Sequence, residues 1–283
     1  MMTFTSRQML LASAGILVSA AFAVGAAVAA GTAAQSASPP DFSSGQTAWQ
    51  TGNGGAFTAV AGTPGPMTND PAYPFVPNGR GIQPTFRIAD LSTPNLKQWA
   101  KDVMKKDNDE VIAGKIAYTP GSSCKPAGVP AFLLAGGPFY FVQSPKEVMI
   151  IMQGDHQVRH VYMGVPHSAN VKPSWYGESV GRYEGDTLVI DTIGQSTKTF
   201  VDNYRTPHTE KLHVVERWRM VDDGKAIEVH VTVDDQDTYN QPWQATRQFR
   251  RVQGTLQEAA CAESNLNFGL FDYHIPVAEK PDF

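Results

Sequence analysis

The feature that most constrains the fold is a series of short strand-like runs separated by turn residues, which extends from Phe139 to Val252. Two such runs with turn residues between them indicate a β-hairpin. Three pairs and a closing strand are present: Glu147–Gln153 with Gln157–Met163, Ser179–Tyr183 with Thr187–Thr192, Leu212–Met220 with Ala226–Val233, and Trp243–Val252. No helical segments alternate with them, which excludes a doubly wound parallel sheet. The pattern predicts a mainly β fold, an antiparallel meander of about eight strands.

A sheet of this size removes its edges by closing, so we expect a barrel, calycin-like by analogy of fold only. A barrel of about eight strands can hold one small ligand. A two-sheet sandwich is the competing architecture. One helix is predicted before the barrel: Ser92-Thr93-Pro94 supplies the start signal, and apolar residues at helical spacing follow, namely Leu96, Trp99, Val103 and Met104.

The N-terminus, residues 1–30, is typical of a signal peptide. Arg7 precedes an apolar stretch, Met9 to Ala30, and Ala27-Val28-Ala29 supplies the small residues of a cleavage site. An uncleaved membrane anchor is the alternative, because the stretch is long enough to span a bilayer. With cleavage, we expect a periplasmic or secreted protein that is not attached to a membrane.

The rest of the chain divides by composition. Residues 31–69 are rich in Gly, Ala, Ser, Thr and Pro and are predicted to be a flexible spacer. Residues 70–138 are expected to be an extended segment and a helix that pack on the barrel, residues 139–253 the barrel, and residues 254–283 a C-terminal extension.

Charge and cysteine content limit the partners. The chain has 27 acidic and 23 basic residues, a net charge of −4, which lacks the basic excess of a nucleic-acid-binding protein. Cys124 and Cys261, in an oxidising compartment, are predicted to form a disulfide, with two free or catalytic thiols as the alternative. The oligomeric state stays open.

Two charged residues fall on the apolar face of predicted strands. Alternation places Glu216 with Val214 and Trp218, and Arg247 with Ala245. Because a buried carboxylate needs a partner, we expect a Glu216–Arg247 pair inside the barrel. It would be a carboxylate-binding or acid/base site, or alternatively a structural ion pair.

Histidines at strand ends and turns supply the second candidate set. Imidazole titrates near neutrality, so His208 or His213 would move a proton while Glu216 orients it. His160 and His167 are candidate substrate-binding residues together with Arg247. The spacing of His208 and His213 is not that of a helical zinc motif, so no metal site and no cofactor are predicted; zinc or copper is a minor alternative.

Trp175 and Tyr176 lie in a loop before a predicted hairpin. At the mouth of a barrel they could stack on a planar or apolar ligand, although packing is the commoner role of such residues. The neighbouring serines lack the G-x-S-x-G context of a hydrolase nucleophile.

Two long motifs carry a resemblance. Residues 174–194 read SWYGESVGRYEGDTLVIDTIG, and residues 206–217 read TPHTEKLHVVER. From about Cys124 to Cys261 the chain resembles a family of secreted, largely uncharacterised bacterial proteins. The resemblance implies the same domain and carries no established reaction. Arg182-Tyr183 and Gln195-Ser196 stand where the family pattern has an aromatic pair and Phe-Asn, a departure that would change ligand preference.

These features lead to two expectations about function. The first is a periplasmic enzyme that acts by acid/base chemistry on a small, partly apolar molecule, as a lyase, hydratase or isomerase. The second is a non-catalytic barrel that binds a lipid or aromatic ligand.

Overall fold

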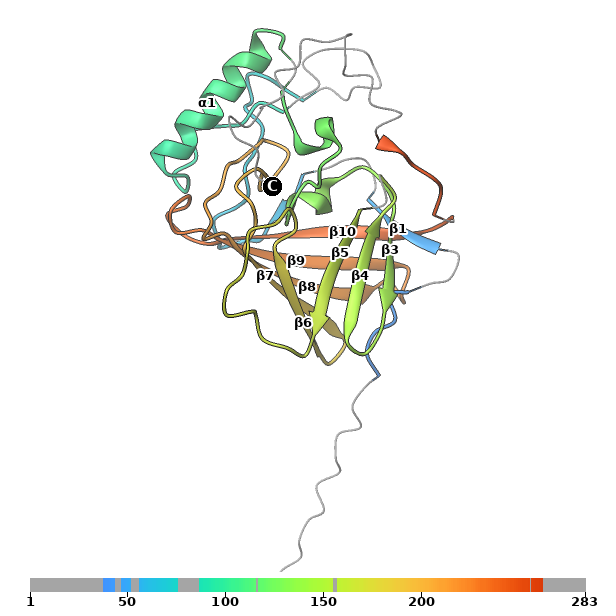
Figure 1. Cartoon of the computed structure of the whole chain (residues 1–283). Helices are drawn as coiled ribbons and strands as arrows, with labels where there is room; N and C mark the ends of the chain where they lie inside the picture. Colours follow the sequence, from blue (N-terminus) through green and yellow to red (C-terminus); the bar gives the residue numbers. More distant parts are fainter. Residues whose placement is uncertain are drawn as a thin grey trace, which may run out of the picture. The chain divides into compact units, whose positions relative to one another are not determined.

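The computed structural model describes residues 38–43, 47–51, 56–75, 87–115, 117–154, 157–254 and 256–261. Backbone contacts group the chain from Ala37 onward into one compact unit (Figure 1). The predicted signal peptide lies outside the described residues, as do residues 262–283 of the predicted C-terminal extension.

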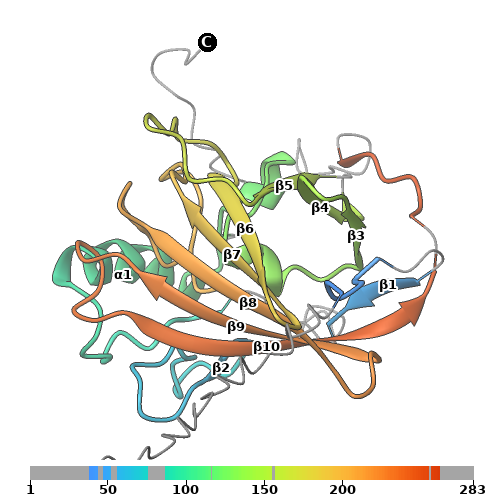
Figure 2. The same cartoon turned by 90° about the horizontal axis from the view of Figure 1, so that it is seen from below.

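Among the described residues, nine strands form a closed barrel and a tenth, β2, pairs with β10 (Figure 2). The strands are β1 (Thr47–Gln50), β2 (Thr58–Ala59), β3 (Phe139–Gln143), β4 (Glu147–Met152), β5 (Val158–Met163), β6 (Glu178–Glu184), β7 (Thr187–Ile193), β8 (His213–Val221), β9 (Ala226–Asp234) and β10 (Trp243–Gln253). The barrel closes because β1 pairs with β3 on one side and with β10 on the other. The predicted mainly β barrel is confirmed.

The three predicted hairpins are present as β4–β5, β6–β7 and β8–β9. The predicted meander is wrong at one junction: β5 and β6 are parallel, with Val161 opposite Ser179. Parallel neighbours need a crossover, and the long connection 164–177 provides it. The strand number also exceeds the predicted eight, because β1 joins the barrel.

β1 lies within the predicted spacer, and here the structure differs from that prediction. Trp49 is fully buried, its indole Nε1 donates a hydrogen bond to the Phe42 carbonyl at 2.9 Å, and the Arg251 guanidinium lies 4.5 Å from its ring centroid. The spacer was predicted from the average composition of the segment. A single aromatic side chain, Trp49, and the pairing with residues 250–253 are enough to hold this strand in place.

The described helix, α1 (Gln98–Ile112), begins later than predicted and buries a different face. Ala100, Met104 and Val111 point into the protein, whereas Trp99 and Val103 are 39% and 41% exposed. Asn108 fixes this orientation, because its side-chain amide both donates to and accepts from the backbone of Ala89. None of the helices among the described residues is long and apolar enough to cross a membrane.

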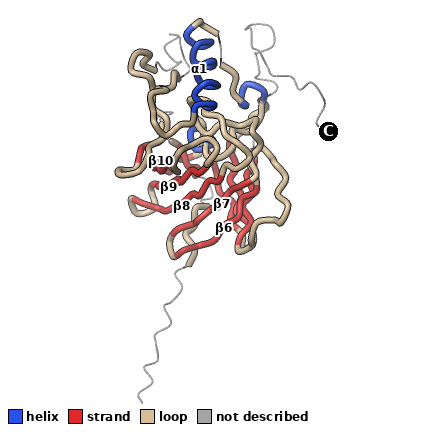
Figure 3. The backbone as a smooth tube through the Cα atoms, turned by 90° about the vertical axis from the view of Figure 1, so that its left-hand side faces the viewer, coloured by secondary structure: helices blue, strands red, loops and turns tan. Residues whose placement is uncertain are grey.

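Two short 3-10 helices, η2 (Pro120–Ser123) and η3 (Ala131–Leu134), lie with α1 at one end of the barrel (Figure 3). η3 extends the core of the barrel, since the Phe132 ring stacks on Trp218 with centroids 6.3 Å apart. Further rings from the strands surround Trp218 at centroid distances of 5.5–6.0 Å: Phe139, Phe141 and Phe249. Aromatic side chains therefore fill this part of the barrel interior.

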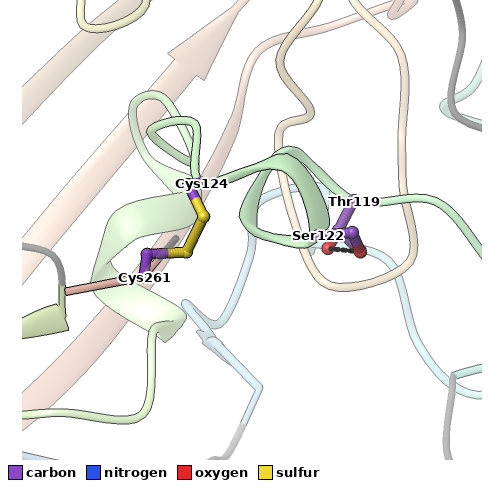
Figure 4. Close-up of a disulfide and its surroundings, with 4 residues drawn as sticks. All are labelled: Thr119, Ser122, Cys124 and Cys261. Atoms are coloured by element: carbon purple, nitrogen blue, oxygen red, sulfur yellow. Dashed lines mark hydrogen bonds between the residues drawn. A yellow bond between two sulfur atoms is a disulfide. The ribbon is translucent and has the colours of Figure 1, made fainter. Parts of the chain in front are cut away.

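The predicted disulfide between Cys124 and Cys261 is confirmed (Figure 4). Cys124 directly follows η2, so the bond ties the chain after β10 to the loop at the helical end.

Candidate functional site

A cavity of about 320 Å³ lies at this helical end, outside the strands. One side is formed by the segment that carries η2 and η3, the other by residues 200–205, and Phe75 and Arg87 complete it. Most of the wall is apolar, with small side chains at Ala127, Ala131 and Ala135. We call it the arginine cavity, because Arg87 and Arg205 both line it.

Arg205 is the unusual residue of the cavity. Its side chain is 2% exposed, and its backbone is in the left-handed region at φ 61°. In the part of the chain that the structure describes, the nearest carboxylate oxygen is Oδ2 of Asp107, which is 3.8 Å from Nε of Arg205 and too far for a hydrogen bond. Among the described residues, none of its three side-chain nitrogens has a hydrogen-bond partner. Burial lowers the pKa of Arg205, and the negative charges of Asp107 and Asp202 partly offset this decrease.

The Asp202 carboxylate, also on the cavity wall, accepts hydrogen bonds from its own turn and none from the Arg205 side chain, whereas the Asp202 backbone carbonyl accepts the Arg205 backbone N–H at 3.2 Å. Oδ1 accepts the backbone N–H of Tyr204 at 2.8 Å and that of Thr206 at 3.2 Å, and the Thr206 hydroxyl also donates to this carboxylate. Burial raises the pKa of Asp202, although these hydrogen bonds act to lower it. Asp202 and Thr206 thus fold the turn that presents Arg205.

Arg87 brings a second guanidinium to the cavity. Its central carbon lies 4.0 Å from the ring centroid of Phe75 and 5.8 Å from that of Tyr204. Stacking on aromatic faces is a favourable place for a guanidinium.

His208 lies behind this wall with both ring nitrogens occupied. Nδ1 is 2.9 Å from the Thr209 carbonyl, so it must donate there, and Nε2 is 2.8 Å from the Thr199 hydroxyl. In the neutral ring Nε2 is an acceptor and competes with the Ser196 carbonyl, 3.0 Å from the same hydroxyl, for its one proton. Burial lowers the pKa of His208, which favours that neutral form. Thr199 in turn packs on Gly128, where a Cβ would come within 2.6 Å of it. His208 therefore supports the loop that carries the cavity alanines.

Glu216 is buried as predicted, but the predicted partner Arg247 is wrong. Arg159 of β5 binds Glu216 in a two-pronged ion pair, with Nη2–Oε2 at 2.5 Å and Nη1–Oε1 at 3.1 Å. The same guanidinium donates to the hydroxyls of Ser179 and Thr192. All four side chains are buried.

The strand register explains the error. Glu216 is opposite Val231, and Val231 is opposite Ala245, so Arg247 lies one interior position further along β10. Arg247 is half-buried and donates from Nη1 to the Ala56 carbonyl at 3.2 Å.

His213 and His167 meet on the outside of the barrel at Asp191. Each approaches Asp191 Oδ1 with its Nε2 at 2.9 Å, and Nδ1 of His167 is 3.0 Å from Oε1 of Glu178. Although burial opposes it, the bonds from the two imidazoles lower the pKa of Asp191. Alternation along β8 puts His213 outside and Glu216 inside, so the structure does not bring the predicted catalytic residues together.

The remaining candidates occupy separate places. The Tyr176 ring is perpendicular to that of Phe132, with centroids 6.3 Å apart, and its hydroxyl donates to Oε1 of Gln157 at 3.1 Å. Burial raises the pKa of Tyr176 to about 12. Trp175 beside it is partly buried. His160 is exposed, with Nδ1 2.5 Å from Oε1 of Glu147.

Comparison with known proteins names no relative. No family model matches the chain, and neither the curated proteins nor the solved structures contain a significant match. The family resemblance therefore stays a prediction. Within the described residues, no group of three or more His, Cys, Asp or Glu side chains is arranged to hold a metal ion.

Sequence reasoning missed the residues of the arginine cavity. The one available signal was position, because Arg205 directly precedes the motif TPHTEKLHVVER. A single arginine in a loop otherwise gives no periodic pattern that would mark it as buried.

Proposed function

We propose that this protein binds a small, partly apolar molecule in the arginine cavity. The observation that carries the proposal is a mostly apolar cavity of about 320 Å³ with a buried arginine in its wall. Small-molecule sites are typically concave, mostly apolar and about 300–1,000 Å³ in volume, with a few polar groups that orient the ligand. In this proposal the barrel is the scaffold that supports the cavity. The analogy to calycin-like barrels is limited to the binding of one small ligand by each protein.

The expected location belongs to the same proposal. A periplasmic or secreted binding protein accords with the predicted signal peptide, and the Cys124–Cys261 disulfide is of the kind that persists in an oxidising compartment.

Ligand-dependent thermal stabilisation tests the proposal. A library of small acids, amides and alcohols is screened for compounds that raise the melting temperature, because a ligand that binds only the folded state stabilises it. Ala127→Phe, which fills the cavity, is expected to abolish the rise. Ala113→Phe adds the same ring at the exposed end of α1 and should keep it. The proposal fails if no compound stabilises the wild type, or if Ala127→Phe binds as well.

Acid/base catalysis of a lyase, hydratase or isomerase type is the second proposal, carried by the two imidazoles on Asp191. Turnover of a compound found in the screen should then fall in His167→Gln and His213→Gln and persist in His160→Gln. Equal turnover in all three variants would remove this candidate.

A further inference from the structure

We propose that the ligand of the arginine cavity carries a single carboxylate, which Arg205 binds. This inference rests on the proposed function and adds the chemical class of the ligand.

The first step concerns the donors of Arg205. A guanidinium has five N–H groups and no acceptor, and buried polar groups are nearly always hydrogen-bonded. All three side-chain nitrogens of Arg205 are buried without a partner among the described residues. Its backbone is fixed by the turn that Asp202 and Thr206 hold, so the side chain is kept at the cavity wall by the fold. Because these nitrogens are closed off, an acceptor that enters through the cavity and displaces the side chains over them would complete this arrangement.

The second step concerns charge. Asp107 lies with Oδ2 3.8 Å from Nε of Arg205, and Asp202 lines the cavity beside it. Because these two carboxylates offset the positive charge of Arg205 and Arg87, each further negative charge on a ligand is unfavourable, so a monoanion is favoured over a dianion such as a phosphate ester. A carboxylate also matches the planar fork of a guanidinium, which can bind it through two parallel hydrogen bonds.

The third step concerns the rest of the ligand. Most of the remaining wall is built from small and aromatic apolar side chains, and Thr119, Gly121 and Asn203 complete it. The apolar residues are Ala127, Ala131, Ala135, Phe75, Phe200 and Pro120. These residues offer dispersion contacts and no ionic partner. The matching ligand is a short alkyl or arylalkyl carboxylic acid with its carboxylate at Arg205.

Paired probes test the inference by titration calorimetry: phenylacetate against phenylacetamide, hexanoate against hexanamide, and phenyl phosphate as the dianion. We expect each acid to bind at least about tenfold more tightly than its amide, the scale of charge-assisted hydrogen bonds. Arg205→Met should remove this preference and leave amide affinity unchanged. Arg219→Met, an exposed arginine on β8, should preserve it.

The melting temperature of the ligand-free variants separates binding from a structural role. An arginine retained for a ligand leaves the free protein with unbonded buried donors, so Arg205→Met combined with Asp107→Asn, which also removes the carboxylate 3.8 Å from Arg205, should melt at the wild-type temperature or above it. A structural arginine would make the same variant melt well below wild type, which would overturn the inference. If Arg205→Met does not fold, Arg205→Lys decides: it keeps the charge without the fork, and should weaken acid binding without affecting the amides.

The two proposals fail in different ways. Amides that bind the wild type as tightly as acids, or phenyl phosphate that binds more tightly than phenylacetate, would overturn the carboxylate inference and leave small-molecule binding intact. If Ala127→Phe binds every probe as well as wild type does, both proposals are overturned.

Discussion

The pair of Arg159 and Glu216 shows what one buried charge requires of its surroundings. Removing one partner of a buried ion pair leaves the other uncompensated, at a cost of about 3–5 kcal/mol. Glu216→Gln should therefore lower the free energy of unfolding by about that amount, measured by urea denaturation. The double replacement Arg159→Met with Glu216→Met should recover most of the loss.

Glu228→Gln is the matched control, because Glu228 pairs with Arg219 at the surface, at 3.7 Å. An exposed pair contributes at most about 1 kcal/mol. If Glu216→Gln lowered the free energy of unfolding by no more than Glu228→Gln does, the buried pair would not stabilise the fold.

The contact of His213 with Asp191 makes stability depend on pH. The hydrogen bond from His213 to Asp191 raises the pKa of His213 above its usual 6.5. A raised folded-state pKa contributes stability that is complete below the unfolded pKa and is lost as the pH rises through the folded value. Wild type should thus exceed His213→Gln most at about pH 5.5 and least at about pH 8.5.

The size of that difference is limited because His213 is 42% exposed, so solvent screening keeps it below about 1 kcal/mol. Urea denaturation at the two pH values measures it. A difference that grows with pH would contradict the assigned contact.

Single residues were predictable from the sequence only where a local rule decides their place. Glu216 was assigned to the interior because alternation along one strand is a local property. The partner of Glu216 could not be assigned in this way. Arg159 reaches Glu216 only because of the register between four strands, from β5 through β6 and β7 to β8. Arg205 follows no periodic rule, and only the folded loop shows that it is buried.

At the scale of elements, the loop between α1 and β3 depends on the disulfide. Thr119, Pro120 and Gly121 line the arginine cavity, and Cys124 is a few residues further on (Figure 4). Reduction, or Cys124→Ser with Cys261→Ser, should therefore lower both the stability and the affinity for any cavity ligand. The bond links residues 137 apart in sequence, and a disulfide typically contributes about 2–4 kcal/mol.

Calorimetry with and without reductant checks both effects on the same protein. Unchanged affinity with reduced stability would show that the cavity wall holds its shape without the disulfide, against this prediction.

The hairpins were the elements best predicted, because a turn signal and two alternating runs are contiguous in sequence. The helix was located less well: Leu96 fits the helical period but precedes α1 and forms a β-bridge with Tyr239 instead. The parallel contact of β5 and β6 is set by the crossover, which the strand pattern does not encode.

At the scale of the whole molecule, closure depends on a strand that lies far from its partners in sequence. A chain that begins at residue 56 lacks β1 and exposes the edges of β3 and β10, and unpaired edges promote association. We expect this variant to be less stable than a chain that begins at residue 38, and to self-associate. Light scattering coupled to size exclusion measures the mass of each, and two monomers of equal stability would contradict the role of β1.

Closure also has a consequence for how the molecule is made. Thr47 faces Gln253 across the seam of the barrel, so the first of the described strands to leave the ribosome is joined by the last of them. Synthesis proceeds from the N-terminus at about 5–20 residues per second, which leaves the nascent sheet open until its final strand is delivered. During that interval the edges of β1 and β9 that later receive β10 are unpaired.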